Sequence, residues 1–410
     1  MNRNGYRTLL LAAALTLLPA LALAHGDATT HNAAHTKSDK ATKAPRSKAR
    51  LAIGATVAPD GRLWIVGVNS AGRLFLQSSA DAGTTWSEPR LLDIGNDTPM
   101  ANGEAHPGIA FASPAHGDWV VVTYNQALAK PYTGEVRMLR SADGGKTFSA
   151  PFTVHRDRQI ITHSFESAGF DARGVLHTVW IDKRDKVLRG DKAASYAGAA
   201  IYRNESRDGG LSFGPDIKVA DHGCECCRLV LAPTQDGRLA AMWRHVFAPN
   251  IRDHAFTVLG EPGKDMVRAT FDGWKLDACP HHGPGLAAAA SGGYHAVWFG
   301  ERAGRSAVRY GQLAADGSPR GDVQELPDPR AEHANVITMG TQVAIVWRSY
   351  DGTRTHLRAW VSADDGAHFS VRELASSTDE NDHPRVVALK QGMQVVWRTA
   401  KEIHVIALTP

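Results

Sequence analysis

The sequence predicts an all-β fold, a β-propeller of four-stranded blades, because two repeats overlap along most of the chain. The first repeat is the pattern Ser-x-Asp-x-Gly-x-x-aromatic, which begins at Ser79, Ser141, Ser206 and Ser362. The second is a short apolar strand closed by tryptophan, found at Trp180, Trp243, Trp298, Trp347 and Trp397. Its spacing of roughly 50–60 residues suits one four-stranded blade for each copy.

Two earlier apolar strands, at residues 63–68 and 119–124, occupy places equivalent to the strands that end in tryptophan. Seven units emerge in this way, so we expect seven blades, with six as the alternative. The last unit has room for only three strands before the chain ends. Residues 43–49 could supply its fourth strand, which would close the propeller with both ends of the domain.

The Ser-x-Asp segments are expected to be tight turns. The Asp and Ser side chains can hydrogen-bond the backbone of the turn, and the Gly can supply a positive φ. Four copies of this pattern resemble the Asp box of sialidase-like propellers, and the resemblance covers about residues 50–408. It implies that these turns join the third and fourth strands of a blade, and that ligands bind on the opposite face.

The first 24 residues have the composition of a secretory signal peptide. Arg3 and Arg7 precede a short apolar run, and small residues come before an expected cleavage after Ala24. The run is short for a membrane span, and no later stretch approaches about 20 apolar residues. We therefore expect a periplasmic or secreted protein without a membrane span.

A tail is expected between the signal peptide and the propeller domain of residues 50–410. Residues 25–49 are rich in Lys, Ala and Thr and lack large apolar side chains, so they cannot form a core. The tail carries His25, His31 and His35, which are either solvated linker residues or loose metal ligands.

The net charge of the chain is misleading about its partners. The formal charge is +4, but residues 1–24 carry +2 and residues 25–50 carry +4. Residues 51–410 are left with −2, which argues against a nucleic-acid-binding surface. No motif for an organic cofactor is present.

Polar clusters precede or open the first strand of each predicted blade, and we call them lead-in segments. Six of the seven contain His or Cys, at Glu104–His106, His163–Glu166, Cys224–Cys227, Cys279–His282, Glu332–His333 and Asp382–Pro384. The first strand of each blade lines the central channel of a propeller. Residues that are far apart in the sequence are therefore expected to meet around one opening.

Imidazoles and thiols at one opening predict a transition-metal site, for copper or zinc. The expected ligands are His106, His163, Cys224, Cys226, Cys227, Cys279, His281, His282, His333 and His383. Each histidine alone could instead cap a strand. The four cysteines could alternatively form disulfides, which are the default outside the cytoplasm, with Cys226 or Cys227 linked to Cys279.

A glycoside hydrolase is the alternative function, and the sialidase resemblance implies it. That family uses an arginine triad for the sugar carboxylate, a Tyr–Glu nucleophile pair and an Asp acid/base. The candidate carboxylates are Glu104, Glu166, Glu332 and Asp382, and the candidate arginines are Arg244, Arg348 and Arg398. The Phe/Tyr-Arg-Ile-Pro motif of the family is absent.

A third reading is a scaffold without catalysis, which presents its rim to a protein or a glycan. The sequence therefore leaves open whether the protein is an enzyme.

Overall fold

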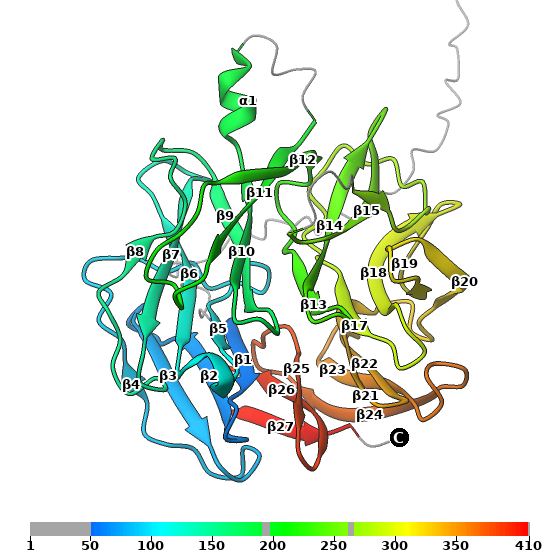
Figure 1. Cartoon of the computed structure of the whole chain (residues 1–410). Helices are drawn as coiled ribbons and strands as arrows, with labels where there is room; N and C mark the ends of the chain where they lie inside the picture. The colour runs from blue at the N-terminus through cyan, green and yellow to red at the C-terminus, as the bar shows by residue number, and fades with distance from the viewer. Residues whose placement is uncertain (1–50, 191–196, 261–265, 409–410) are drawn as a thin grey trace, which may run out of the picture. The chain divides into compact units, whose positions relative to one another are not determined.

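The computed structural model describes residues 51–190, 197–260 and 266–408, and Figure 1 shows that their regular secondary structure is almost entirely β-strand. The described helices are short, α1 (Arg184–Leu188) and the 3₁₀ turn η1 (Pro114–His116). In this part of the chain no helix has the length and apolar character needed to cross a membrane. The predicted signal peptide, the tail and the closing strand at residues 43–49 lie outside the described residues.

The strands follow one another as successive antiparallel units. The first unit holds β1 (Ile53–Val57), β2 (Leu63–Val68), β3 (Leu74–Ser79) and β4 (Arg90–Leu91), and the second holds β5 (Gly108–Phe111), β6 (Val120–Ala127), β7 (Gly134–Ser141) and β8 (Phe152–Thr153). The third holds β9 (His163–Phe170), β10 (Leu176–Asp182), β11 (Ala199–Ser206) and β12 (Ile217–Gly223). The fourth holds β13 (Val230–Pro233), β14 (Leu239–Phe247), β15 (Ile251–Val258) and β16 (Val267–Arg268).

The remaining strands complete the same pattern. The fifth unit holds β17 (Gly285–Ala288), β18 (Tyr294–Arg302), β19 (Arg305–Leu313) and β20 (Pro319–Glu325). The sixth holds β21 (Glu332–Met339), β22 (Gln342–Tyr350), β23 (Thr355–Ser362) and β24 (Ser370–Ser377), and the last holds β25 (Arg385–Leu389), β26 (Gly392–Arg398) and β27 (Ile403–Ala407).

The first strands of the units contact one another in a closed ring, in the order β1, β5, β9, β13, β17, β21, β25 and back to β1. This arrangement confirms the predicted β-propeller fold. Hydrogen bonding joins the described strands into six sheets, because a single β12–β14 pair, Gly223 with His245, merges two units into one eight-stranded sheet. The number of blades stays a prediction.

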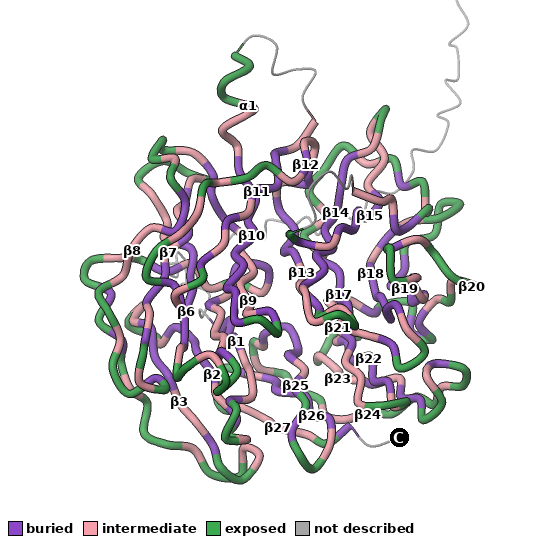
Figure 2. Tube along the Cα trace, viewed as in Figure 1, coloured by how far each residue is buried: buried purple, intermediate pink, exposed green. Residues whose placement is uncertain are grey.

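The core lies mostly between neighbouring units, because alternate residues of each second strand face opposite neighbours. One cluster joins Ala344 and Val346 of β22 to Val395 and Trp397 of β26. The tryptophans of the second strands are buried, and β14, β18 and β22 continue beyond them; Figure 2 shows the same burial along the inner strands. Most of their indole N–H groups donate to a carboxylate or carbonyl oxygen, as Trp347 does to Asp328. The repeated tryptophans therefore serve to pack neighbouring units against each other.

The four Ser-x-Asp turns have one hydrogen-bond pattern, and each joins the third and fourth strands of its unit. In the turn after β11, the Ser206 hydroxyl donates to Asp208 Oδ1 at 2.7 Å and accepts from the N–H of Gly210 at 2.8 Å. The Asp208 carboxylate then accepts from the N–H of Ser212. The other three turns repeat these bonds. The predicted turn mechanics are therefore confirmed.

We predict that Ser206→Ala destabilises the protein by about 1–3 kcal/mol, because it leaves buried polar groups of the turn without a partner. Urea unfolding followed by tryptophan fluorescence measures the change in midpoint. Ser70→Ala, in an exposed turn, is the control and should leave the midpoint unchanged. An equal midpoint for both variants would show that the turn contributes no stability.

Candidate functional site

The lead-in segments lie at the N-terminal ends of the first strands, as the repeat register predicts. Glu104–His106 precedes β5, Cys224–Cys227 precedes β13, and Cys279–His282 precedes β17. His163 and Glu332 open β9 and β21, and Asp382–Pro384 precedes β25. Because these strands form one ring, residues that are almost 280 positions apart in the sequence are brought into contact.

Glu104 is the hub of these contacts. Its Oε2 atom accepts hydrogen bonds from the backbone N–H groups of Arg228 (3.0 Å) and Gly283 (2.9 Å). Its Oε1 atom accepts from Arg228 Nη1 at 3.0 Å, in a buried ion pair. Burial is the largest single influence and opposes ionisation of Glu104, but the charge of Arg228, the neighbouring His333 and the backbone N–H of Arg228 together outweigh it and hold the pKa below its usual range. One carboxylate therefore ties three lead-in segments together.

Three histidines from consecutive units stack beside Glu104. The ring centroids of His282 and His333 are 4.2 Å apart, and those of His333 and His383 are 3.4 Å apart. The Nδ1 atoms of His333 and His383 lie 3.4 and 3.6 Å from Glu104 Oε1. His106 Nδ1 instead lies 2.9 Å from the carbonyl oxygen of Pro107, to which it can donate.

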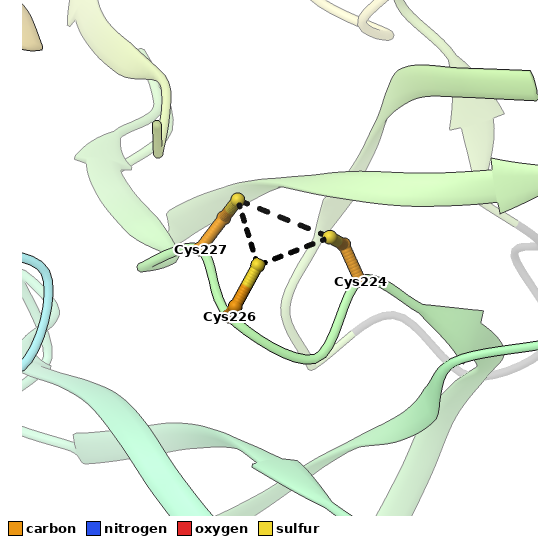
Figure 3. Close-up of side chains that lie close together, drawn as sticks. All are labelled: Cys224, Cys226 and Cys227. Atoms are coloured by element: carbon orange, nitrogen blue, oxygen red, sulfur yellow. Dashed lines mark hydrogen bonds between the residues drawn. The ribbon is translucent and has the colours of Figure 1, made fainter. Parts of the chain in front are cut away.

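The cysteines form a separate group, drawn in Figure 3. The Sγ atoms of Cys224, Cys226 and Cys227 make a triangle with sides of 3.8, 3.9 and 3.8 Å. These three side chains are buried and all four cysteines are free, so the structure contains no disulfide between them. Cys279 is exposed, and its thiol interacts with Cys226.

Basic side chains surround the thiol triangle. Arg252 Nη1 lies 3.5 Å from Cys224 Sγ, and hydrogen bonds with the other two thiols together with Arg244 and Arg252 lower the pKa of Cys224. Burial and the neighbouring thiol raise the pKa of Cys227. The loop is anchored outside the triangle as well, because Glu225 pairs with Lys183 and Lys186 at α1.

Two of the predicted ligands lie apart from both groups. His163 is fully buried, with Nδ1 2.9 Å from Asp182 and Nε2 3.3 Å from Asp157. Its ring stacks on His155, and Trp180 donates to the same Asp182 oxygen, so His163 belongs to a closed packing network. His281 is exposed, with a positive φ of 53°. The structure brings neither residue to Glu104 or to the thiols.

The candidate arginines bind backbone carbonyl groups of the next unit. Arg244 donates to the carbonyls of His282 and Phe299, at 3.0 and 2.7 Å. Arg348 donates to the carbonyl of Asn381 and pairs with Glu332. Arg398 donates to the carbonyls of Leu51 and Val68. Each follows the tryptophan of its second strand directly, so these arginines clamp neighbouring units together.

The candidate carboxylates differ in how they are paired. Asp382 accepts from the backbone N–H of Ile53, and Glu332 pairs with Arg348. Both carboxylates, with Arg348 and His383, line a cavity of about 620 Å³. The buried oxygens of Glu166 have no hydrogen-bond partner among the described residues, and burial raises the pKa of Glu166 to about 8.

Comparisons with known proteins bear on the fold. No protein-family model and no curated protein matches the sequence. A polysaccharide lyase of family PL25, an ulvan lyase, is structurally similar with a TM-score of 0.54 and 10% identity, over 88% of this chain and 94% of that chain. The GH93 α-L-arabinofuranosidase of Fusarium graminearum matches with a TM-score of 0.51 and 14% identity, over 80% and 92% of the two chains.

The leech intramolecular trans-sialidase is also similar, with a TM-score of 0.48 and 10% identity over 84% of this chain and 81% of that chain. The fold is a β-propeller, as the closed ring of first strands shows. At these identities the likeness concerns the fold alone, and chemistry has to be argued from the site.

The sequence did not single out Arg228, Arg252 or Asp182 as site residues. Arg228 follows Cys227 directly in a lead-in segment, so its position in the repeat was a usable signal. Arg252 is the second residue of β15 and Asp182 is the last residue of β10, and neither carries a mark in the sequence that separates it from other charged residues.

We predict that Glu166→Gln removes a pH dependence of stability. The pKa of Glu166 is about 8 in the folded protein and about 4.3 in an unfolded chain, so its stabilising effect is full below about pH 4. That effect is lost at about 1.4 kcal/mol for each pH unit as the pH rises toward 8. Buried histidines with lowered pKa values act in the opposite direction in both proteins, so the test is the difference between the urea midpoints at pH 5 and pH 8. Relative to wild type, Glu166→Gln should shift this difference toward greater stability at pH 8.

The control is Glu88→Gln, which changes an exposed carboxylate. It should keep the wild-type difference between the two pH values. A Glu166→Gln variant with the same difference as wild type would contradict the raised pKa.

Proposed function

We propose that this protein is an exported copper-binding propeller, and that the thiols of Cys224, Cys226 and Cys227 hold copper as Cu(I). The observation that carries the proposal is the triangle of three buried sulfur atoms with sides of 3.8–3.9 Å. The neighbouring Cys279 thiol serves as the solvent-facing ligand.

The size of the triangle fits metal ligation better than it fits a disulfide. A disulfide needs sulfur atoms about 2.05 Å apart. Sulfur atoms that share one metal ion at about 2.3 Å are roughly 3.8 Å apart in tetrahedral geometry and about 4.0 Å apart in trigonal geometry. The three distances are close to these values, and all three thiols come from one short loop held at both ends.

The chemistry of the ligands favours a soft ion. Thiolates select Cu(I) and zinc over harder divalent ions. Three thiolates with one Cu(I) carry a charge of −2, and Arg244 and Arg252 beside Cys224 supply two compensating positive charges. Buried apolar thiols would otherwise be inert, so these two guanidinium groups are the feature that prepares them for a metal.

Cys279 gives the buried triangle a route to solvent. Its thiol is exposed, and its hydrogen bond with Cys226 lowers its pKa to about 7. A thiol with this pKa is half ionised at neutral pH, and the thiolate is the form that captures a metal. The predicted signal peptide and the histidines of the tail agree with capture of copper outside the cytoplasm.

We predict that the reduced full-length protein, with His25, His31 and His35 changed to Ala, retains one Cu(I) per chain. Anaerobic titration against a chromophoric Cu(I) chelator measures the affinity. Cys226→Ser should weaken Cu(I) binding by more than about 100-fold. Substitution of a residue that only hydrogen-bonds to a metal ligand already weakens metal affinity by about 10–100-fold, and Cys226 is a ligand itself.

Met242→Leu is the matched control for this experiment. It removes a buried sulfur atom from β14 without touching a thiol, so Cu(I) affinity should stay unchanged. Equal affinity of Cys226→Ser and wild type would overturn the proposal. Retention of zinc in preference to Cu(I) would overturn the choice of copper.

A glycoside hydrolase is a second candidate, favoured by one observation. The cavity of about 620 Å³ brings together Glu332, Asp382 and Arg348, three of the residues expected to carry such chemistry. The pKa of Glu166 near 8 would also keep that carboxyl protonated, as a general acid requires. Against it, Arg244, Arg348 and Arg398 already bind carbonyl groups and do not form an open carboxylate clamp.

We predict no turnover of a fluorogenic sialoside or arabinofuranoside above the rate of a Glu166→Gln, Asp382→Asn double variant. The assay compares wild type and this variant at pH 5 and pH 7 under equal protein concentration. Activity in wild type that the double variant lacks would establish the hydrolase and leave the copper site as a separate property.

A further inference from the structure

The stack of His282, His333 and His383 has a property that packing alone does not supply. The Nδ1 atoms of all three rings are buried, and none meets hydrogen-bond geometry with another described residue. A buried polar atom without a hydrogen bond is unfavourable, because burial removes its contacts with water. Two of these atoms, Nδ1 of His333 and Nδ1 of His383, face Glu104 Oε1 at long distances of 3.4 and 3.6 Å, which leaves room for an ion that all three atoms could bind.

The three rings are fixed by the fold. His282 stacks between Phe299 and His333, with ring centroids 4.3 and 4.2 Å away, and His383 follows on the other side of His333. The ring of His383 lies over Gly103, where a Cβ atom would come within 2.1 Å of it. The stack and the absence of a side chain at position 103 therefore hold the imidazoles in place.

The rings are neutral ligands at physiological pH. Burial lowers the pKa of all three, and the pKa values of His282 and His383 are lowered further by the neighbouring His333. A neutral imidazole offers one nitrogen lone pair, which is the form that binds a metal.

Glu104 supplies the oxygen atom of the same group. The distances from its Oε1 atom to Nδ1 of His333 and His383 are 3.4 and 3.6 Å. Ligand atoms about 2.0–2.1 Å from one tetrahedral ion are roughly 3.4 Å apart. The possible ligand atoms of Glu104, His333 and His383 all lie within 4.8 Å of one another.

The surroundings give the group charge balance and access. Arg228 neutralises Glu104 and leaves the second lone pair of Oε1 open. Asn102, Gly103 and His383 line the cavity of about 620 Å³, so an ion can reach the stack from solvent.

We propose that Glu104, His333 and His383 form a second metal centre for a divalent first-row ion such as Zn²⁺. This centre contains no thiol and is independent of the Cu(I) site. Nitrogen and carboxylate ligands suit borderline divalent ions, whereas thiolates suit Cu(I). The protein would then hold two ions of different chemical class at neighbouring lead-in segments.

The test uses full-length protein in which His25, His31 and His35 are Ala and the four cysteines are Ser. Titration with Co²⁺, followed by the visible absorption of the bound ion, and competition with Zn²⁺ measure the centre without any thiol. The expected result is one divalent ion per chain. His333→Asn should weaken binding by more than about 100-fold.

His368→Asn is the matched control. That imidazole is 91% exposed in the last Ser-x-Asp turn, so its loss should leave divalent-ion binding unchanged. Absence of bound ion in the cysteine-free protein, or equal affinity of His333→Asn and His368→Asn, would overturn the second centre.

A companion measurement covers the case in which the cysteine-free protein does not fold. With the native cysteines in place and loaded with Cu(I), His333→Asn should hold one divalent ion fewer than its parent by elemental analysis after dialysis. Equal divalent content would overturn the second centre. A parent protein that retains the divalent ion but does not retain Cu(I) would count against the copper proposal and leave this centre standing.

Discussion

The ring of first strands is the constraint on which the rest of the molecule depends. Because each first strand contacts the next, the segments that lead into these strands must end beside one another. Glu104 lies in one of these segments and contacts two others. Its carboxylate receives hydrogen bonds from Arg228 and Gly283, which belong to two other units. Removal of one partner of such a buried ion pair costs about 3–5 kcal/mol, so the hub fixes the geometry of both neighbouring ligand groups.

Within the same ring, the arginines, the thiols and the stacked imidazoles have different surroundings and therefore different roles. Arg244 and Arg398 donate to carbonyl groups of the adjacent unit, and this explains why positively charged side chains can line the interior. The thiols lie where Arg244 and Arg252 favour thiolate, whereas the stacked imidazoles lie beside Glu104 and are kept neutral by burial. Neighbouring loops thus differ in the kind of ion that they can hold.

The fold could be predicted from the sequence because its signals are local and repeated. A Ser-x-Asp turn is built from hydrogen bonds within seven residues, and each repeated tryptophan lies on the second strand of its unit. The site was predicted less fully because its contacts are between units. The repeat register placed His333 and His383 correctly beside each other, yet it could not show that His163 turns toward Asp182 instead.

Two features of the site could not be predicted from the sequence: the division of the ligands into two groups, and the Glu104–Arg228 ion pair. The division of histidines and cysteines into two groups depends on the direction of each side chain within its loop, which a shared position in the repeat does not define. The pairing of Glu104 with Arg228 depends on a distance across the ring, over 124 residues of chain. Both residues lie at lead-in segments, but charged residues are common near strand ends, so the sequence did not show that these two would pair.

The most direct test of the copper proposal is anomalous diffraction from crystals of the Cu(I)-loaded protein, recorded on both sides of the copper edge. The account predicts a single copper peak among Sγ of Cys224, Cys226 and Cys227, at about 2.3 Å from each. Continuous density between two of these sulfur atoms at disulfide distance, with no copper peak, would contradict it.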